Sequence, residues 1–314
     1  MTNLAKALDE YLTLRRALGF KLREASRQLP RFVQFLEDEG TSFITIELAL
    51  RWAQQDPKAS SAIQSDRLGM IRRFAVWRSA QDMRTQIPPP RLLPRRYTRP
   101  APYIYSDTEV EKIVAATAVL PSAHGLRGLT FSTLFGLLAV TGMRVGEAVA
   151  LDRADVDLTA GTLLIREGKR GKSRIVPFHP STKRILEQYS ERRDAALPDT
   201  KQLAFFISER GRRITSWSAE GNFIKVACAM GLRMSVDGRR GRGPRLHDLR
   251  HRFAVSTLIH WYRSGADVDR EIPKLATYLG HKGPKEVYWY LQAVPELLTL
   301  ATERSRRAPS GGAS

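Results

Sequence analysis

The sequence predicts a mainly α-helical protein with a small β-sheet, an α+β fold divided into two domains. Three observations support this prediction. Apolar residues recur at helical spacing through residues 1–86 and through most of the second half of the chain. A proline-rich stretch at 87–105 separates these two parts. One pair of β-prone runs, at 162–166 and 173–178, surrounds a turn rich in glycine and lysine, which is typical of a β-hairpin.

Residues 1–86 are predicted to form a small domain of four amphipathic helices. The first two runs of helically spaced apolar residues stop at Gly19 and Gly40, and glycine is a residue that commonly ends a helix. The third helix begins near Thr45, and the fourth covers about 60–81. Four arginines are expected on the outer side of this last helix: Arg67, Arg72, Arg73 and Arg78.

The connector at 87–105 contains six prolines and four arginines. Proline lacks a backbone N–H and fixes its φ angle, so neither a regular helix nor a sheet is expected here. The stretch is predicted to be a semi-rigid, extended and cationic linker. The expected boundaries are 1–86 for the helical domain, 87–105 for the linker, 106–300 for the second domain and 301–314 for a C-terminal tail.

The second domain is predicted to begin with a helix capped by residues 106–109, which form a capping-box pattern. Residues 126–140 are apolar around most of the helical circumference, so this helix is expected in the core. It ends at a glycine-containing turn that is followed directly by Arg144. The predicted hairpin then places Lys169 and Lys172 at its cationic tip.

Further helices are predicted at about 181–196 and 218–230, with a short strand at 204–208 between them. A basic loop leads from there into a helix that begins at His247. Two more helices follow, and the second of them holds two tyrosines. Residues 292–307 have an apolar side that requires a groove in the same chain or in a partner.

The chain carries a large positive charge. Its 51 Lys and Arg residues oppose 32 Asp and Glu, which gives a formal net charge of +19. Such an excess is typical of nucleic-acid-binding proteins, although a basic protein with no polyanionic partner can share it. The candidate DNA contacts are Arg67, Arg72, Arg73, Arg95, Arg96, Arg239, Arg240, Arg242 and Arg245.

Cysteine content and apolar runs indicate the cellular setting. The single cysteine excludes an intrachain disulfide and a cysteine-rich zinc site. The N-terminal residues lack the apolar core of a signal peptide, and no uninterrupted apolar run reaches transmembrane length. We therefore expect a reducing, cytoplasmic location with no membrane partner.

A set of cationic and hydrogen-bonding residues recurs along the second domain. His247 and Arg250 are three residues apart near the start of a helix, so both point to one face, where backbone N–H groups favour an anion. Such a pair alone is also common on protein surfaces. With Arg144, His281 and a tyrosine nine residues after His281, these residue types are suited to holding a phosphodiester while a phenol oxygen attacks it.

Five ordered motifs resemble those of the tyrosine recombinase, or phage integrase, family. They are TGMRVGE, GKRGKSRIVPF, LHDLRH, YLGHK and YWYL, and the resemblance covers about residues 106–300. It implies an N-terminal helical core-binding (SAM-like) domain and a C-terminal catalytic domain that form a C-shaped clamp on DNA. The last motifs also resemble the transposon-associated branch that includes recombinases occurring in trios. The implied function is site-specific DNA recombination in integration, excision or transposition.

The resemblance also implies how the phosphate is held. Arg144 and Arg250 would grip the non-bridging oxygens of the scissile phosphate, where negative charge concentrates in the transition state. His281 would add a further hydrogen bond to the same oxygens. Glu147 would support the arginines from behind, although an acidic residue in the first turn of a helix need have no catalytic role.

The remaining implied roles concern the nucleophile and the protons. Tyr290 would attack the phosphorus, with Tyr288 as the alternative, because the spacing from the last histidine motif matches the family at Tyr290. His247 would assist proton transfer near the nucleophile. Lys169 would protonate the leaving 5′ oxygen, with Lys172 as the alternative.

By the same resemblance, the reaction needs neither a metal nor a cofactor, because a covalent 3′-phosphotyrosyl bond keeps the energy of the phosphodiester. The expected partners are double-stranded DNA with paired inverted repeats, further copies in a tetramer on DNA, and sister recombinases. A monomer or weak oligomer is expected when the protein is free of DNA. The expected location is the cytoplasm, in association with the nucleoid. Two alternatives stay open at this point: DNA relaxation of the type IB topoisomerase kind, and DNA binding without catalysis.

Overall fold

The chain folds into two compact units, Met1–Pro100 and Ala101–Ser314. The structure is a computed structural model that describes residues 3–94, 101–166, 173–234 and 243–307. Each unit buries hydrophobic side chains of its own. The division between the units falls within the proline-rich stretch that the sequence marked as a linker.

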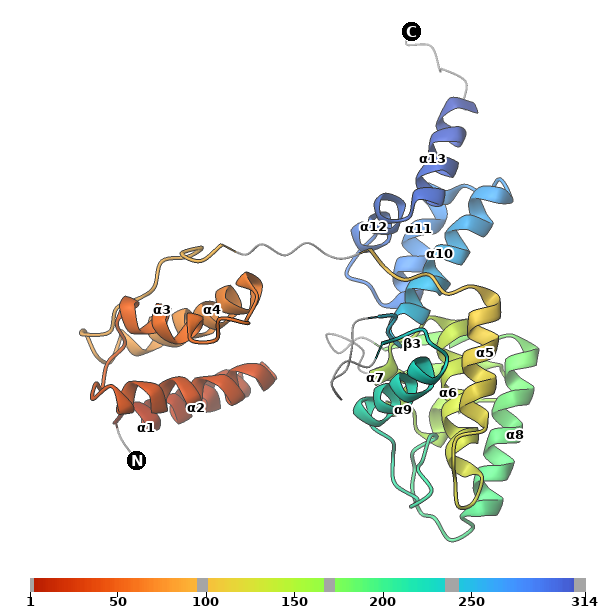
Figure 1. Ribbon diagram of the computed structural model, residues 1–314, viewed down its shortest axis with the longest axis horizontal. Coiled ribbons are helices and arrows are strands. Elements are labelled where there is room, and N and C mark those ends of the chain that lie inside the picture. Colours follow the sequence, from red (N-terminus) through yellow and green to blue (C-terminus); the bar gives the residue numbers. More distant parts are fainter. Residues whose placement is uncertain (1–2, 95–100, 167–172, 235–242, 308–314) are drawn as a thin grey trace. The chain divides into compact units, whose positions relative to one another are not determined.

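The N-terminal unit is a small all-helical domain (Figure 1). Its helices are α1 (Asn3–Ala17), α2 (Arg23–Asp38), α3 (Ile46–Gln54) and α4 (Ser61–Arg78). Phe32, Trp52 and Phe74 are among the side chains fully buried in its core. Thr45 caps α3, because its side chain accepts a hydrogen bond from the backbone N–H of Leu48. The four predicted helices are confirmed.

One arginine of α4 lies inside this unit. Arg78 is only 5% exposed, and its guanidinium donates to Oε1 of Gln81 at 3.1 Å. The carboxylate of Asp82 lies 3.5 Å from the same guanidinium. The expectation that Arg78 faces outward is therefore wrong, because polar groups just after the helix compensate its charge within the fold.

The C-terminal unit is built around one buried helix, α6 (Leu126–Thr141). α5 (Asp107–Ala118) and α8 (Pro180–Ala196) pack beside it, as Figure 1 shows. α7 (Val145–Ala150) follows α6 after a short turn, and α9 (Ser216–Ala229) packs on α5 and α7. The core helix and the capping box at the start of α5 are both confirmed.

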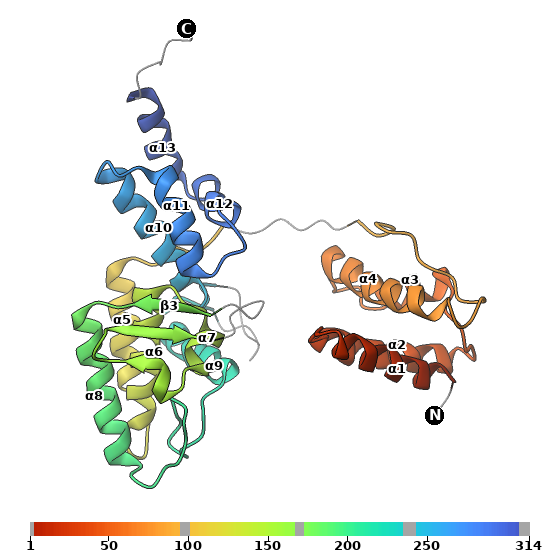
Figure 2. The same ribbon diagram turned by 180° about the vertical axis from the view of Figure 1, so that it is seen from behind.

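A three-stranded antiparallel sheet shares this core (Figure 2). Its strands, in order, are β1 (Val156–Asp157), β2 (Thr162–Ile165) and β3 (Arg174–Pro177). β2 and β3 form the predicted hairpin, with Leu163 paired with Val176 and both side chains buried. The predicted tip, at 167–172, lies outside the described residues. The predicted fold class, mainly helical with a small sheet, is confirmed.

Two details of this unit differ from the sequence prediction. β1 was not predicted, because a run of two residues that follows the short 3-10 helix η1 (Arg153–Asp155) leaves no detectable period. The strand predicted at 204–208 is wrong. The structure has isolated bridges there, from Ala204 to Asp152 and from Ile207 to Arg213. Residues 204–207 are buried, so their apolar character reflects a core-facing connection that a strand pattern also fits.

A second group of helices forms the end of the chain (Figures 1 and 2). They are α10 (Asp248–Arg263), α11 (Val268–Leu279), α12 (Lys285–Ala293) and α13 (Pro295–Arg307), and they enclose a separate hydrophobic cluster. α13 packs on α10 and α12 of the same chain, with Leu297 fully buried, so its apolar side finds a groove in cis. Among the described helices, none is long and apolar enough to cross a membrane.

Candidate active site

A tight turn between α6 and α7 fixes the position of Arg144. Gly142 ends α6 with a φ of 60°, a left-handed conformation that favours glycine. A Cβ atom at this position would lie 2.5 Å from the ring of Phe253, so the turn approaches α10 closely. Arg144 is then the N-cap residue of α7, and its backbone N–H donates to Glu147 at 3.0 Å.

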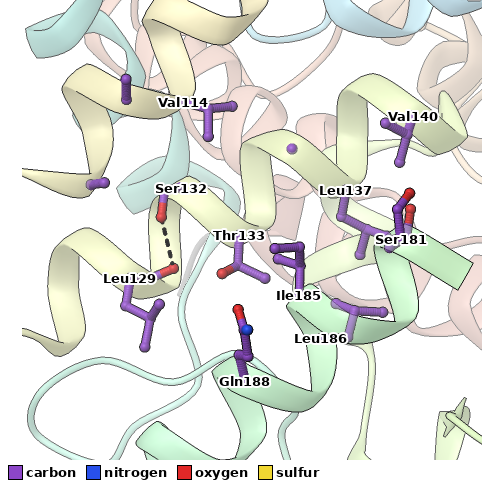
Figure 3. A pocket seen from close by; sticks show the side chains of 14 residues that line it. Val114, Leu129, Ser132, Thr133, Leu137, Val140, Ser181, Ile185, Leu186 and Gln188 are labelled. Atoms are coloured by element: carbon purple, nitrogen blue, oxygen red, sulfur yellow. Dashed lines mark hydrogen bonds between the residues drawn. The ribbon is translucent and has the colours of Figure 1, made fainter.

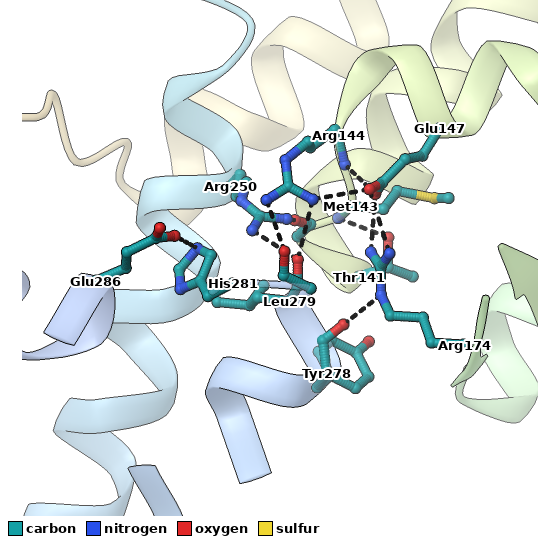
Figure 4. A network of polar contacts seen from close by, with 12 residues as sticks. Thr141, Met143, Arg144, Glu147, Arg174, Arg250, Tyr278, Leu279, His281 and Glu286 are labelled. Atoms are coloured by element: carbon teal, nitrogen blue, oxygen red, sulfur yellow. Dashed lines mark hydrogen bonds and ion pairs between the residues drawn. The ribbon is translucent and has the colours of Figure 1, made fainter. Parts of the chain in front are cut away.

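Arg144 and Arg250 converge on the end of α11, although they are distant in sequence (Figure 4). Arg144 donates to the carbonyl oxygens of Leu279 at 3.3 Å and Gly280 at 3.0 Å. Arg250 donates to the same Leu279 oxygen at 2.7 Å and to that of Gly142 at 2.9 Å. The shared acceptor holds the two guanidinium groups close together. Each guanidinium has more N–H donors than these carbonyl bonds use, so both can also bind an anion.

Glu147 and Arg174 support this pair from the other side. Glu147 accepts hydrogen bonds from Arg144 and from Arg174, each at 2.8 Å, and its side chain is 8% exposed. Arg174, on β3, also donates through Nε to the carbonyl oxygen of Tyr278 at 2.7 Å. These contacts tie the sheet to α7 and α11. The sequence analysis named Glu147 but not Arg174. A sequence feature that could have indicated Arg174 is its position on the strand that follows the basic turn.

The charge of Glu147 gives the fold a pH-dependent stability. Burial raises the pKa of Glu147, but hydrogen bonds from Arg174 and Arg144 outweigh burial and hold the pKa at about 2. Because this pKa lies below the ordinary value of 4.5, the carboxylate stabilises the fold above pH 4.5 and loses that effect as the pH falls towards 2.

We expect Glu147→Gln to lower the free energy of unfolding at neutral pH by about 3 kcal/mol, because two arginines lose their counter-charge. The difference from the unchanged protein should shrink as the pH falls from 4.5 towards 2, where Glu147 itself becomes protonated. Urea unfolding of both proteins across this range measures the effect. A difference that stays constant with pH would contradict it.

Arg144, Arg174 and Arg250 bring three positive charges close to the end of α11, and Glu147 balances one of them. Burial and the charge of Arg144 lower the pKa of Arg250 to about 10, and Tyr290 is among the groups that raise it. Arg250 therefore stays protonated at neutral pH. Desolvation by neighbouring groups and the charge of Arg250 lower the pKa of His247 to about 4, although the residue as a whole is exposed. A phosphate placed here would offset the excess positive charge.

The two predicted histidines lie at the ends of different helices. His281 directly follows Gly280, which ends α11 with a left-handed φ of 65°. The His281 side chain is 7% exposed, and its Nε2 lies 3.9 Å from Glu286. It thus comes immediately after the two carbonyl groups to which the arginines donate, as Figure 4 shows. His247 is the N-cap residue of α10, one turn before Arg250.

The two candidate nucleophiles have different surroundings on α12. Tyr290 is 1% exposed, and its Oη lies 2.7 Å from Nδ1 of His251, a residue that sequence reasoning did not single out. Tyr288 is 40% exposed, and its Oη donates to Asp269 at 3.4 Å. Burial and the charge of Asp269 raise the pKa of Tyr288, which disfavours its phenolate. Tyr290 contacts His251, which directly follows Arg250 on α10, so this geometry favours Tyr290.

Seven predicted residues lie outside the described part of the chain: Lys169, Lys172, Arg95, Arg96, Arg239, Arg240 and Arg242. The other four candidate DNA contacts lie in described regions. Arg72 and Arg73 line a pocket of about 600 Å³ between α4 and residues 89–94. Arg67 is half-buried, and Arg245 is exposed and paired with a carboxylate of α10.

An apolar pocket of about 410 Å³ lies elsewhere in the C-terminal unit (Figure 3). α5, α6 and α8 line it with side chains such as Val114, Leu137 and Ile185. No residue of the arginine and histidine cluster lines this pocket. The apolar pocket is therefore separate from the candidate active site.

The fold and the paired arginines indicate a class of protein: an enzyme that acts on the phosphates of a polyanion, with a buried tyrosine in contact with the helix that carries Arg250. Residues 105–296 match the phage integrase family. Over 98% of both chains, the protein is 43% identical to y4rB of Sinorhizobium fredii, an inferred integrase/recombinase. The chain belongs to the phage integrase family of tyrosine recombinases. Its activity is site-specific recombination, in which DNA is cleaved and rejoined.

Solved structures show the same fold. The Tn1549 transposon integrase, in complex with transposon right-end DNA, aligns with a TM-score of 0.63 over 96% of this chain and 99% of that one, at 15% identity. A lambda integrase tetramer bound to a Holliday junction aligns with a TM-score of 0.59 over 91% and 79% of the two chains, at 19% identity. Of the three functions considered from the sequence, recombination is confirmed, and the topoisomerase and non-catalytic readings are not favoured.

Proposed function

We propose that this recombinase exchanges strands between paired inverted repeats through the cluster around Leu279. One observation carries the proposal: Arg144 and Arg250 donate to the same Leu279 carbonyl, directly before His281. Guanidinium groups held by backbone carbonyls need no rearrangement when charge develops on a phosphate, so they stabilise the transition state selectively. His281 adds a donor for the same oxygens, and Glu147 holds Arg144 in place.

In the proposed reaction, Oη of Tyr290 attacks the scissile phosphorus and forms a 3′-phosphotyrosyl bond. Lys169, or Lys172 in its place, protonates the leaving 5′ oxygen, and His247 assists proton transfer. A 5′-hydroxyl of another strand then attacks the phosphotyrosine and releases Tyr290. The proposed chemistry uses no energy-rich cofactor, because the covalent bond retains the energy of the phosphodiester. It uses no metal, because the arginines stabilise the charge on the phosphate.

We infer that the partners are duplex DNA and further copies of the chain. The two units would close on duplex DNA as a clamp, with the arginines of α4 and of the basic loops on the phosphates. Recombination joins two duplexes, so we infer a tetramer on DNA, a state seen for the lambda integrase on a Holliday junction. Without DNA, a monomer or weak oligomer is expected. Sister recombinases of the transposon-associated type are further proposed partners.

DNA that flanks the gene provides the test. Footprinting with the purified protein should show protection of a pair of inverted repeats, and binding should weaken steeply as salt rises. The double variant Arg72→Ala and Arg73→Ala should reduce the slope of log K against log salt by about 2, because each arginine is expected to neutralise one phosphate. Protection without inverted repeats, or relaxation of an unrelated supercoiled plasmid, would contradict the proposal.

A further inference from the structure

A buried histidine without a role in the proposed reaction contacts the proposed nucleophile. His251 lies on α10, one residue after Arg250, and its side chain is 5% exposed. Its Nδ1 lies 2.7 Å from Oη of Tyr290, which is itself 1% exposed. The ring of Trp289 lies 5.9 Å from the His251 ring, centroid to centroid, and helps to enclose the contact. Water therefore has little access to the bond between Tyr290 and His251.

The surroundings of His251 select the tautomer of its ring. Oδ1 of Asp248 lies 4.0 Å from Nε2, on the side of the ring opposite Tyr290. Asp248 is 2% exposed, and Arg245 holds it through its backbone N–H at 2.7 Å and its guanidinium at 2.9 Å. A carboxylate on this side favours the proton on Nε2. In that tautomer, Nδ1 presents its lone pair to Tyr290 and accepts a hydrogen bond from its O–H.

His247 is less suited to receive the same proton. Its ring lies perpendicular to that of His251, with 4.9 Å between the centroids. Desolvation by neighbouring groups and the charge of Arg250 lower the pKa of His247 to about 4, because a further positive charge beside the arginines is unfavourable. A positive charge on His251 lies near the carboxylate of Asp248 instead. The order of hydroxyl, imidazole and carboxylate is the arrangement by which proteins activate hydroxyl nucleophiles.

We propose that His251 is the immediate proton acceptor for Tyr290. As the bond from Oη to phosphorus forms, the phenol proton passes to Nδ1 of His251, and the bond from phosphorus to the 5′ oxygen breaks. The 5′ oxygen takes its proton from the separate acid proposed above. In the reverse step, His251 returns its proton to the departing Tyr290. This inference rests on the proposed role of Tyr290 as nucleophile.

Two substitutions in the full-length protein separate proton transfer from hydrogen bonding. His251→Asn keeps an amide near the position of Nδ1 that can accept a hydrogen bond, but it cannot take a proton. His251→Ala removes both properties. On a nicked duplex that carries the flanking repeat, we expect both variants to form the covalent adduct at least about 100-fold more slowly, with unchanged DNA affinity. His260→Asn, on the exposed end of the same helix, is the matched control and should keep the normal rate.

A second duplex distinguishes the base from the acid. When sulfur replaces the leaving 5′ oxygen, departure no longer needs a proton, so a Lys169→Ala variant should recover adduct formation. The His251 variants should stay slow on this duplex, because Tyr290 must still lose its proton. Recovery of His251→Asn on the sulfur duplex would place His251 on the leaving-group side and overturn the proposal.

Other outcomes are equally decisive. A normal rate for His251→Asn would show that His251 only forms a hydrogen bond with Tyr290. A faster rate for His251→Ala would show that His251 holds Tyr290 in an inactive position. Either result overturns the proposal but leaves Tyr290 as the nucleophile. Adduct formation by Tyr290→Phe would instead overturn the proposed nucleophile as well. If the variants do not fold, ¹⁵N NMR of histidine in the unchanged protein decides: a proton on Nε2 of His251 supports the proposal, and one on Nδ1 refutes it.

Discussion

Tyr290→Phe is expected to abolish the covalent protein–DNA adduct while DNA binding is retained. The substitution removes the attacking oxygen and leaves the ring that fills the core formed by α10 to α13. The lost hydrogen bond to His251 should cost about 1 kcal/mol of stability, so the variant should fold. Denaturing gel electrophoresis with a nicked duplex detects the adduct, and a mobility-shift assay on the same duplex measures binding.

Tyr288→Phe is the matched control for this result. Tyr288 lies two positions earlier on α12, but it is 40% exposed and its hydroxyl bonds Asp269 rather than a residue of the cluster. Its loss should leave adduct formation unchanged. If Tyr290→Phe still gives the adduct and Tyr288→Phe does not, the nucleophile is the exposed tyrosine, and α12 must turn to bring it to the arginines.

The fold was predictable where a local pattern and the tertiary structure agree. The buried helix α6 is apolar on most sides, and the capping box of α5 is a local hydrogen-bond arrangement, so both could be identified from sequence. Residues 204–207 gave a false strand because an apolar run records burial and not hydrogen-bond partners. Arg78 was placed outside because helical spacing does not reveal the polar groups that follow a helix and draw an arginine inward.

In the candidate site, too, local motifs could be recognised in the sequence, whereas contacts between distant elements could not. The motifs identified Arg144, Arg250 and His281, but not the Leu279 carbonyl on which both arginines converge, because backbone acceptors leave no trace in residue type. Arg174 was missed for a related reason: it stands beside a recognised motif, but its role depends on contacts with α7 and α11, which are distant in sequence.

His251 was missed for the same reason, because the residue that it contacts, Tyr290, lies on α12 and is distant in sequence. An alternative view of LHDLRH as a local anion site explains His247 and Arg250, which share a helix face, but it does not explain a third polar residue buried on that helix. The contact with Tyr290 does so. Sequence motifs thus indicated candidates for contact with the substrate, whereas the structure was needed to find the residues that hold the arginines and the histidine that we propose activates Tyr290.

Arg250→Lys is expected to slow adduct formation by about 100- to 1000-fold, although the positive charge is kept. The guanidinium of Arg250 bonds the carbonyl oxygens of Gly142 and Leu279 at once, and so joins the end of α6 to the end of α11. A lysine ammonium at one point cannot span both carbonyls and also bind a phosphate oxygen with fixed geometry. Single-turnover adduct formation on the nicked duplex measures the loss.

Two further measurements separate catalysis from folding in this variant. Because Arg250 is 3% exposed, one unpaired buried carbonyl should also lower the free energy of unfolding by about 1–3 kcal/mol, so thermal unfolding should confirm that the variant remains folded at the assay temperature. Arg263→Lys is the control on the same helix, where an exposed ion pair with Glu296 at 2.8 Å contributes little. A normal adduct rate for folded Arg250→Lys would show that charge alone suffices at this position, and that the bridge between Gly142 and Leu279 serves the fold and not the reaction.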